Sequence, residues 1–204
     1  MSTSQSVLWE TLNKHLFPTT TYHYNSGGDP EHIPDLRYED LLSFYKEHYH
    51  PSNAVFMTFG DIPAVELQEK IHEQALKEFT ALPEKIRGRD EKRYHAPMRV
   101  EEAYALDEEG TSAKTHIVMG WLLGQTANLR ERFEAELLSG ILLENSASPL
   151  RHYLETTELA QSPSSLCGVD DSGRELSFMC GIEGSEPERA AAFEEGVLAV
   201  VGHF

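Results

Sequence analysis

The ten histidines are the first residues to consider for chemistry, because imidazole is the commonest metal ligand and titrates near neutral pH. A zinc-peptidase helix carries two histidines four positions apart, so that both rings face the metal. No histidine here has another four positions on, and the nearest arrangement, His72-Glu73, has Leu76 in the second place. His48 and His50 stand two apart across a predicted helix end, which favours packing or capping. The sequence therefore predicts no metal ligand and no catalytic residue in this chain.

Nucleophile and phosphate motifs are absent from the sequence as well. There is no G-x-S-x-G elbow, and the GGDP segment lacks the Gly-Lys-Ser/Thr ending of a phosphate loop. Two cysteines, Cys167 and Cys180, are too few for a disulfide framework. They flank an Asp-Ser-Gly turn and could lie opposite one another on two strands. Free thiols are the favoured state, and the role of the pair stays open.

Aromatic residues in the first quarter of the chain are the candidates for a peptide groove. Phe44 and Tyr45 fall on a helical pattern, so we expect them to pack in a core, where each ring contributes roughly 1.5–3 kcal/mol. Tyr22 and Tyr24 lie in a predicted loop and are less constrained. These two tyrosines are the substrate-binding candidates.

Composition limits the class of partner. The chain has 17 basic and 34 acidic residues, a net charge of −17, which repels phosphate backbones and argues against nucleic-acid binding. Solubility explains most of this charge, and attraction of basic peptides is a second interpretation. No apolar run approaches the roughly 18–20 residues of a membrane helix, so no membrane partner is expected.

The first half is predicted to alternate helices and turns around one strand. Apolar residues at helical spacing predict a helix over 5–17 and another over 38–49, the second after a turn at 27–30. The apolar run 54–59 predicts a strand buried on both faces. A further helix is predicted to begin at Pro63.

The second half begins after a charged stretch. Residues 83–97 are bounded by prolines and have few apolar side chains, which predicts a solvated linker. Strands are then predicted near 98–105 and over 115–123, followed by a helix over 128–143 with its leucines facing inward.

The remainder of the chain completes the layout. A short helix over 149–156, a β-hairpin over 166–184 and a helix from Pro187 are predicted in that order. The fold class is therefore α+β, with an antiparallel sheet and helices packed on one face.

Several of these segments together resemble the insulinase-type (pitrilysin-like) zinc metallopeptidases, in particular the presequence-protease branch. The ordered set SGGDP, IPDL, YEDLLSFYKEHYHPSN and AVFMTFGDIP is similar to the closing segment of the family's first, catalytic domain. WLLG, ENSASPL and the following hairpin resemble the opening of the next domain. Arg37 departs from the pattern, since relatives often place a helix-capping threonine there.

The resemblance implies a domain organisation. Residues 1–82 correspond to the C-terminal part of the first domain, 83–97 to the linker, and 98–204 to the beginning of the second domain, which is incomplete. It also implies that the zinc motif His-x-x-Glu-His lies upstream, outside this chain.

The resemblance further implies a parent enzyme. That parent is a zinc metalloendopeptidase which degrades short unfolded peptides in a chamber, while this fragment is structural, inactive and binds no zinc. Its partners are then unfolded peptides and the remaining domains of the same polypeptide. The alternative is a non-catalytic peptide-binding or assembly module of the same fold. A cytoplasmic location is expected, with the mitochondrial matrix or a plastid as the alternative.

Overall fold

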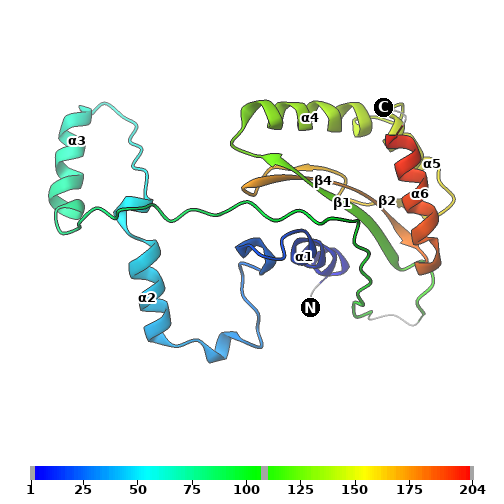
Figure 1. Ribbon diagram of the computed structural model, residues 1–204, viewed down its shortest axis with the longest axis horizontal. Coiled ribbons are helices and arrows are strands. Elements are labelled where there is room, and N and C mark those ends of the chain that lie inside the picture. The colour runs from blue at the N-terminus through cyan, green and yellow to red at the C-terminus, as the bar shows by residue number, and fades with distance from the viewer. Residues whose placement is uncertain (1–2, 107–109, 203–204) are drawn as a thin grey trace. The chain divides into compact units, whose positions relative to one another are not determined.

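The computed structural model describes residues 3–106 and 110–202. Its contacts group the chain into two compact units, one formed by Met1–Ser26 with Arg89–Phe204 and the other by Gly27–Gly88. The first unit carries the sheet and the buried core (Figure 1). No helix in the described ranges combines the length and the apolar character needed to cross a membrane.

The sheet of the first unit is antiparallel and is built on the long strand β4, Glu175–Ser185. β1, Thr115–Gln125, pairs along one side of β4. Two short strands, β2, Ser162–Pro163, and β3, Gly168–Asp170, pair with successive parts of its other side. β4 is thus the central strand, which explains why nearly all of its residues are buried.

Three helices pack on one face of this sheet: α4, Leu129–Leu143, α5, Pro149–Thr156, and α6, Ala190–Val201 (Figure 1). Asn128 caps α4 by accepting hydrogen bonds from the first backbone N–H groups, and a short 3₁₀ turn, η5, Pro187–Arg189, leads into α6. The core between helices and sheet consists of Leu142, Leu150, Leu154, Phe178, Cys180, Ile182, Phe193 and Val197.

Helix α1, Ser4–Leu16, packs on the opposite face of the sheet. Gly120 of β1 faces it, since a Cβ at this position would lie 3.3 Å from Leu16 Cδ1. Alternate residues of a strand face opposite sides, and the other set in β1 packs against the core: Ile117, Met119, Trp121 and Leu123. The predicted α+β fold with an antiparallel sheet is confirmed, and the helix on the second face is an addition to it.

The second unit contains short helices and no strand among its described residues. Its α-helices are α2, Tyr38–His48, and α3, Ala64–Ile71, the latter continuing into a π-helical turn, η4, His72–Leu76. Two 3₁₀ turns, η2, Ile33–Asp35, and η3, Pro51–Asn53, flank α2, and a third, η1, Thr21–His23, follows α1 in the first unit. The predicted helix over 38–49 is confirmed, as is the helix start after Pro63.

The prediction of a buried strand over 54–59 is wrong for this chain. These residues form no strand, Val55 and Met57 are 89 % and 92 % exposed, and Phe59 is fully exposed. A strand needs a paired neighbour to be stable, and no described strand lies in this unit. The core prediction for Phe44 and Tyr45 fails for the same lack of partners, since both rings are more than half exposed on α2.

Two further predictions, both in the first unit, are also wrong. Residues 98–105 form no strand. In α4 only Ala135 and Leu142 are buried, because the apolar residues occupy both faces of the helix and the sheet covers one. The leucines predicted to face inward belong largely to an exposed outer set: Leu129, Phe133, Leu137, Leu138 and Ile141.

The predicted domain boundaries stay a prediction, since they concern the domains of a longer protein. The compact units group residues 1–26 with the second half of the chain, because α1 packs on the sheet. Glu91, which falls inside the predicted linker, is buried in the first unit.

Candidate functional site

The candidate site is one edge of β1. This strand stands at the end of the sheet and pairs with β4 on one side, and no described strand pairs with its other side. Eleven residues in extended conformation span roughly 35 Å. Such an edge presents unpaired backbone donors and acceptors, which is the surface that an extended peptide can join.

The hydrogen-bond pattern shows which residues of β1 form that edge. Gly181 of β4 directs its C=O toward Ser164 N (2.8 Å) and its N–H toward Cys167 Sγ (3.3 Å), both away from β1. Because successive residues of a strand direct their backbone groups to opposite sides, Cys180 and Ile182 direct theirs toward β1. The register partners of these two residues therefore use their own backbone groups in the ladder with β4.

In the register of the sheet, those partners are Met119 for Cys180 and Ile117 for Ile182. The alternate residues Val118, Gly120 and Leu122 consequently direct their N–H and C=O groups away from β4. We call these backbone groups the outer edge of β1. A peptide added here would pair its main chain with them.

β1 is held in place by packing on both faces. Trp121 and its alternate neighbours contact the core, and Trp121 lies 5.9 Å from the ring of Phe178. On the other face Gly120 leaves room for Leu12 and Leu16 of α1. The strand is therefore rigidly supported, which favours peptide pairing because little ordering of the protein is needed.

A buried carboxylate fixes the chain beside the C-terminal end of β1. Glu91 is 5 % exposed and accepts hydrogen bonds from Thr19 N (2.8 Å), Thr19 Oγ1 (2.6 Å), Thr20 N (3.0 Å) and Lys92 N (2.7 Å). Burial raises the pKa of Glu91, but these hydrogen bonds outweigh it and lower the pKa from 4.5 to about 2. The carboxylate thereby ties the turn after α1 to residues 89–93.

A second carboxylate connects this segment to the sheet. Glu175, the first residue of β4, is buried and accepts from Glu91 N and from Arg93 Nη2, both at 2.6 Å. Arg93 Nη2 also donates to Leu123 O of β1 at 2.6 Å, within the register shift between Leu122 and Gln125 that interrupts the alternation of the strand. The C-terminal end of β1 is therefore capped by a side chain, and the accessible part of the outer edge lies nearer its middle.

A third carboxylate, Asp90, completes the network on its exposed side. It accepts from Arg174 Nε and Gln125 Nε2, both at 2.6 Å, and these hydrogen bonds lower the pKa of Asp90. The three carboxylates all accept hydrogen bonds within the network. It has the character of a structural clamp, and none of its members is placed to act on a substrate.

The two tyrosines predicted as substrate contacts lie in and directly after η1, the turn that follows α1. The Tyr22 hydroxyl accepts from Arg174 N at 2.8 Å, and its ring lies 5.2 Å from that of Phe17, so Tyr22 helps to fix the turn after α1. Tyr24 is 74 % exposed and has its ring against His23. Their part in peptide binding stays a prediction.

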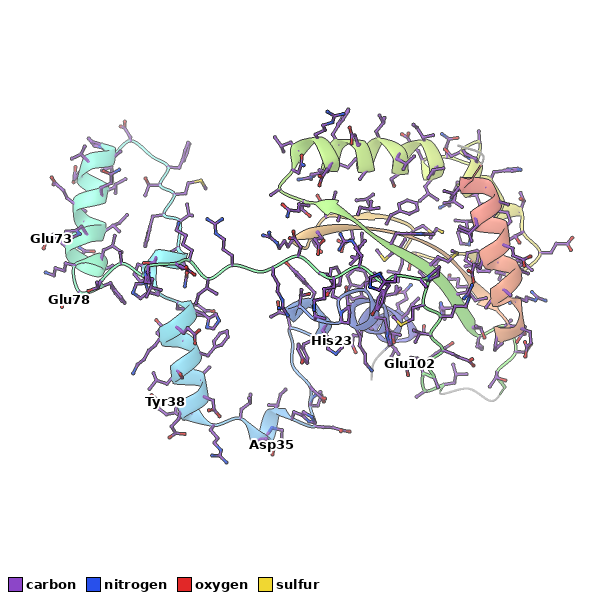
Figure 2. The ribbon with its side chains drawn as sticks, viewed as in Figure 1. His23, Asp35, Tyr38, Glu73, Glu78 and Glu102 are labelled. Carbon is purple, nitrogen blue, oxygen red and sulfur yellow. The ribbon has the colours of Figure 1, made fainter. Side chains whose placement is uncertain are left out.

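The histidines form no metal site in the described parts of the chain, where no group of three or more potential ligands is found. His15 lies 3.9 Å from Glu102, and His23 Nδ1 lies 3.0 Å from Lys14 O (Figure 2). In the second unit His48 stacks on Phe44, and His50 accepts from Ser52 N at the cap of η3. The packing and capping roles predicted for His48 and His50 are confirmed, and the histidines in the described ranges do not group into a set that would hold a catalytic zinc ion.

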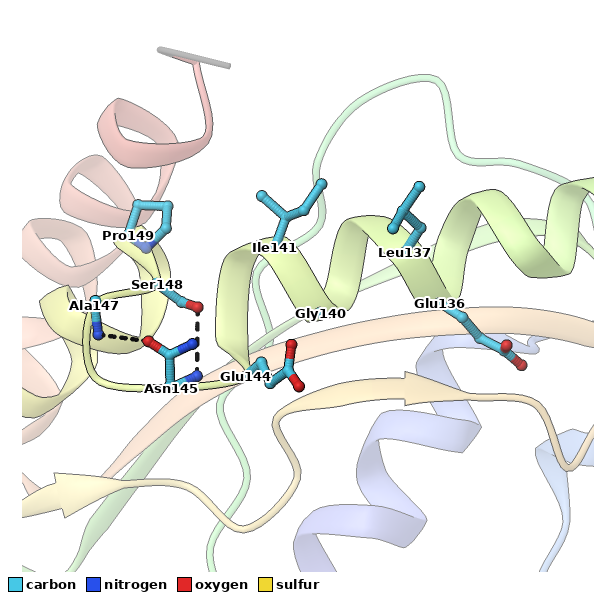
Figure 3. Close-up of a pocket in the computed structure, with 9 residues that line it drawn as sticks. All are labelled: Glu136, Leu137, Gly140, Ile141, Glu144, Asn145, Ala147, Ser148 and Pro149. Atoms are coloured by element: carbon cyan, nitrogen blue, oxygen red, sulfur yellow. Dashed lines mark hydrogen bonds between the residues drawn. The ribbon is translucent and has the colours of Figure 1, made fainter.

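An open hollow of about 650 Å³ lies where α4 meets α5 (Figure 3). Its apolar lining comes from Leu137, Ile141 and Pro149, and Glu136 and Glu144 stand at its side. The Asn145 side chain shapes the turn, because its Oδ1 accepts from Ala147 N at 2.9 Å. The one hydroxyl among its described lining residues, that of Ser148, accepts from Asn145 N at 3.3 Å, and no histidine or cysteine lines the hollow beside it, so the hollow does not have the groups of a nucleophilic active site.

Two features of the site were missed by sequence reasoning. The strand 115–123 was predicted, but edge position depends on tertiary pairing and has no sequence signal. Glu91 lies in a stretch rich in basic residues, and nothing local distinguishes it from its exposed neighbours.

Comparison with known proteins identifies the peptidase family to which the chain belongs. The model of the Peptidase M16 inactive domain matches residues 35–201. The mitochondrial presequence protease of Schizosaccharomyces pombe is 31 % identical over 203 residues, 98 % of this chain and 20 % of that protein. That of Danio rerio is 33 % identical over 90 % of this chain and 18 % of its own length.

A plant relative extends the comparison. Presequence protease 1, chloroplastic/mitochondrial, of Arabidopsis thaliana is 29 % identical over 97 % of this chain and 18 % of that protein. The chain thus spans about a fifth of the length of these curated relatives. It belongs to the M16, or insulinase-type, peptidase family and to its presequence-protease branch.

Proposed function

We propose that this chain is a non-catalytic part of a zinc metalloendopeptidase that degrades short unfolded peptides. The observation that carries the proposal is the similarity to presequence proteases along nearly the whole chain. The described residues form no zinc site, so in this proposal the zinc is held by another part of the parent polypeptide.

The contribution of this chain is a surface for the substrate. The outer edge of β1 pairs with an extended peptide, and main-chain pairing suits an enzyme that accepts many sequences, because backbone groups are common to all peptides. The net charge of −17 adds attraction for basic peptides at low ionic strength. The remaining domains of the parent are the other partners.

The relatives also guide the proposed location. Their names give the mitochondrion or the chloroplast, which supports the mitochondrial matrix or a plastid over the cytoplasmic location expected first from sequence. A fusion of the complete reading frame to a fluorescent protein tests this, with organelle fluorescence expected and uniform cytoplasmic fluorescence contradicting it.

A second candidate is a non-catalytic peptide-binding or assembly module of the same fold. It is favoured by the description of the matching model as an inactive domain. The two candidates predict different protein segments encoded beside this one in the same gene.

Sequencing the complete reading frame distinguishes them. A His-x-x-Glu-His helix with a glutamate ligand further along, in frame before residue 1, is expected for the peptidase. A frame that lacks those ligands would overturn the enzyme proposal and leave the binding module.

A further inference from the structure

The two cysteines lie on neighbouring segments of the sheet. β3 and β4 pair with Gly168 opposite Met179 and Val169 opposite Phe178, and Cys167 and Cys180 each lie next to the Gly168–Met179 pair in the sequence. Gly168 has φ 128°, and regular pairing ends there. The position of Cys167 beyond that point is shown by its own contact, because its Sγ lies 3.3 Å from Gly181 N, the amide bonded to Cys180.

The backbone pattern shows which side of β4 Cys167 contacts. Gly181 directs its N–H and C=O toward the β2–β3 side, so Cys180 directs its own toward β1. Cys167 Sγ lies on that β2–β3 side of β4, against the amide that follows Cys180. A disulfide needs Cα atoms about 4.4–6.8 Å apart, and this contact brings the two cysteines into one neighbourhood.

Both side chains lie on the helix-covered face of the sheet. Cys180 is fully buried in the core, and Cys167 is half-buried and packs against that core. Both thiols are free in the structure. One sulfur is thus reachable by a small oxidant, and the second lies beside it out of solvent.

We propose that Cys167 and Cys180 are an oxidation site that a peroxide converts to a cross-strand disulfide joining β3 to β4. The Cys167 thiolate attacks a peroxide oxygen and breaks the O–O bond, which gives a sulfenic acid and, with hydrogen peroxide, one water. The Cys180 sulfur then attacks Cys167 Sγ, and the hydroxide that leaves takes the Cys180 proton as the second water. Two thiols and one hydrogen peroxide thus give one disulfide and two waters.

The reaction is slow at neutral pH. Burial raises the pKa of Cys180 to about 12 and also raises the pKa of Cys167, so little thiolate is present. Arg151 on α5 acts against burial at Cys167 by favouring its thiolate. Attack therefore begins at Cys167, and its rate rises as the pH is raised toward 9.

The experiment treats the reduced full chain with hydrogen peroxide and follows it by intact mass and a non-reducing peptide map. We expect the loss of two hydrogens per chain, one peptide pair linked through Cys167 and Cys180, and a melting temperature raised by several degrees that returns on reduction. Cys167→Ser and Cys180→Ala are the matched controls, and neither forms an internal link. Cys167→Ser changes a half-buried residue, so it keeps the test valid if Cys180→Ala fails to fold.

Three outcomes would overturn the proposal. These are sulfinic acid at Cys167 with Cys180 still reduced, disulfides only between chains, and thiols that stay reduced in the folded chain under peroxide at pH 9.

Discussion

Glu91 provides the sharpest test of how the first unit holds its shape. Its carboxylate is 5 % exposed and receives three hydrogen bonds from Thr19 and Thr20, which lie more than seventy residues earlier. Glu91→Gln keeps the size of the side chain but removes its charge and turns one acceptor into a donor that faces other donors. Hydrogen bonds to a charged group contribute about 1.5–3 kcal/mol each, and the paired N–H groups lose their partner.

The pKa of Glu91 gives the magnitude of the stabilisation by its carboxylate and the direction in which that stabilisation changes with pH. The difference between 4.5 in the unfolded chain and about 2 in the folded one corresponds to about 3 kcal/mol. Because the folded pKa is the lower one, this stability is complete above pH 4.5 and is lost as the pH falls from 4.5 toward 2. We therefore expect Glu91→Gln to lower the free energy of unfolding by about 2–3 kcal/mol at pH 7 and by much less at pH 2.5.

Urea unfolding followed by tryptophan fluorescence measures this directly, since Trp9 and Trp121 both belong to the first unit. Glu195→Gln, an exposed change on α6, is the control and should shift stability by less than about 0.5 kcal/mol. Equal stability of Glu91→Gln and the unchanged chain at pH 7, with the same dependence on pH, would refute the role assigned to Glu91.

Two further predictions concern α4 and catalysis. Leu142→Ala should lower the free energy of unfolding by about 2–5 kcal/mol because Leu142 is buried in the core. Phe133→Ser, in the exposed outer set, should lower it by less than about 1 kcal/mol. Urea unfolding of both variants checks this, and equal losses would contradict the assignment of the two faces of α4. The purified chain should bind less than stoichiometric zinc by elemental analysis and show no chelator-sensitive cleavage of unfolded peptides, and tight zinc with such cleavage would contradict the proposed inactivity of the fragment.

Local sequence signals predicted most elements of the fold. The helix over 38–49 follows from apolar spacing and a proline stop, and the hairpin follows from the Asp-Ser-Gly turn between alternating strands. These features depend on a few neighbouring residues. Elements of this kind can therefore be predicted from one sequence.

The wrong predictions all concern segments whose pairing or burial depends on residues distant in the sequence. Residues 54–59 have the composition of a buried strand, yet no strand pairs with them in the second unit, so they are exposed. α4 is apolar on both faces, and the sequence does not show that the sheet covers only the face of Ala135 and Leu142. The outer edge of β1 and the burial of Glu91 depend likewise on residues distant in the sequence.

The central claim is that β1 offers its outer edge to an extended peptide. The measurement is the fluorescence anisotropy of a labelled, unstructured, lysine-containing peptide titrated with the full chain. Val118→Pro removes an N–H of the outer edge that β4 does not use, which an edge strand tolerates, and Val118→Ala is the matched control.

We predict saturable binding by the unchanged chain and by Val118→Ala, with binding at least about tenfold weaker for Val118→Pro at an unchanged circular dichroism spectrum. Equal affinity of Val118→Pro and Val118→Ala, or no binding by the unchanged chain, would contradict the claim.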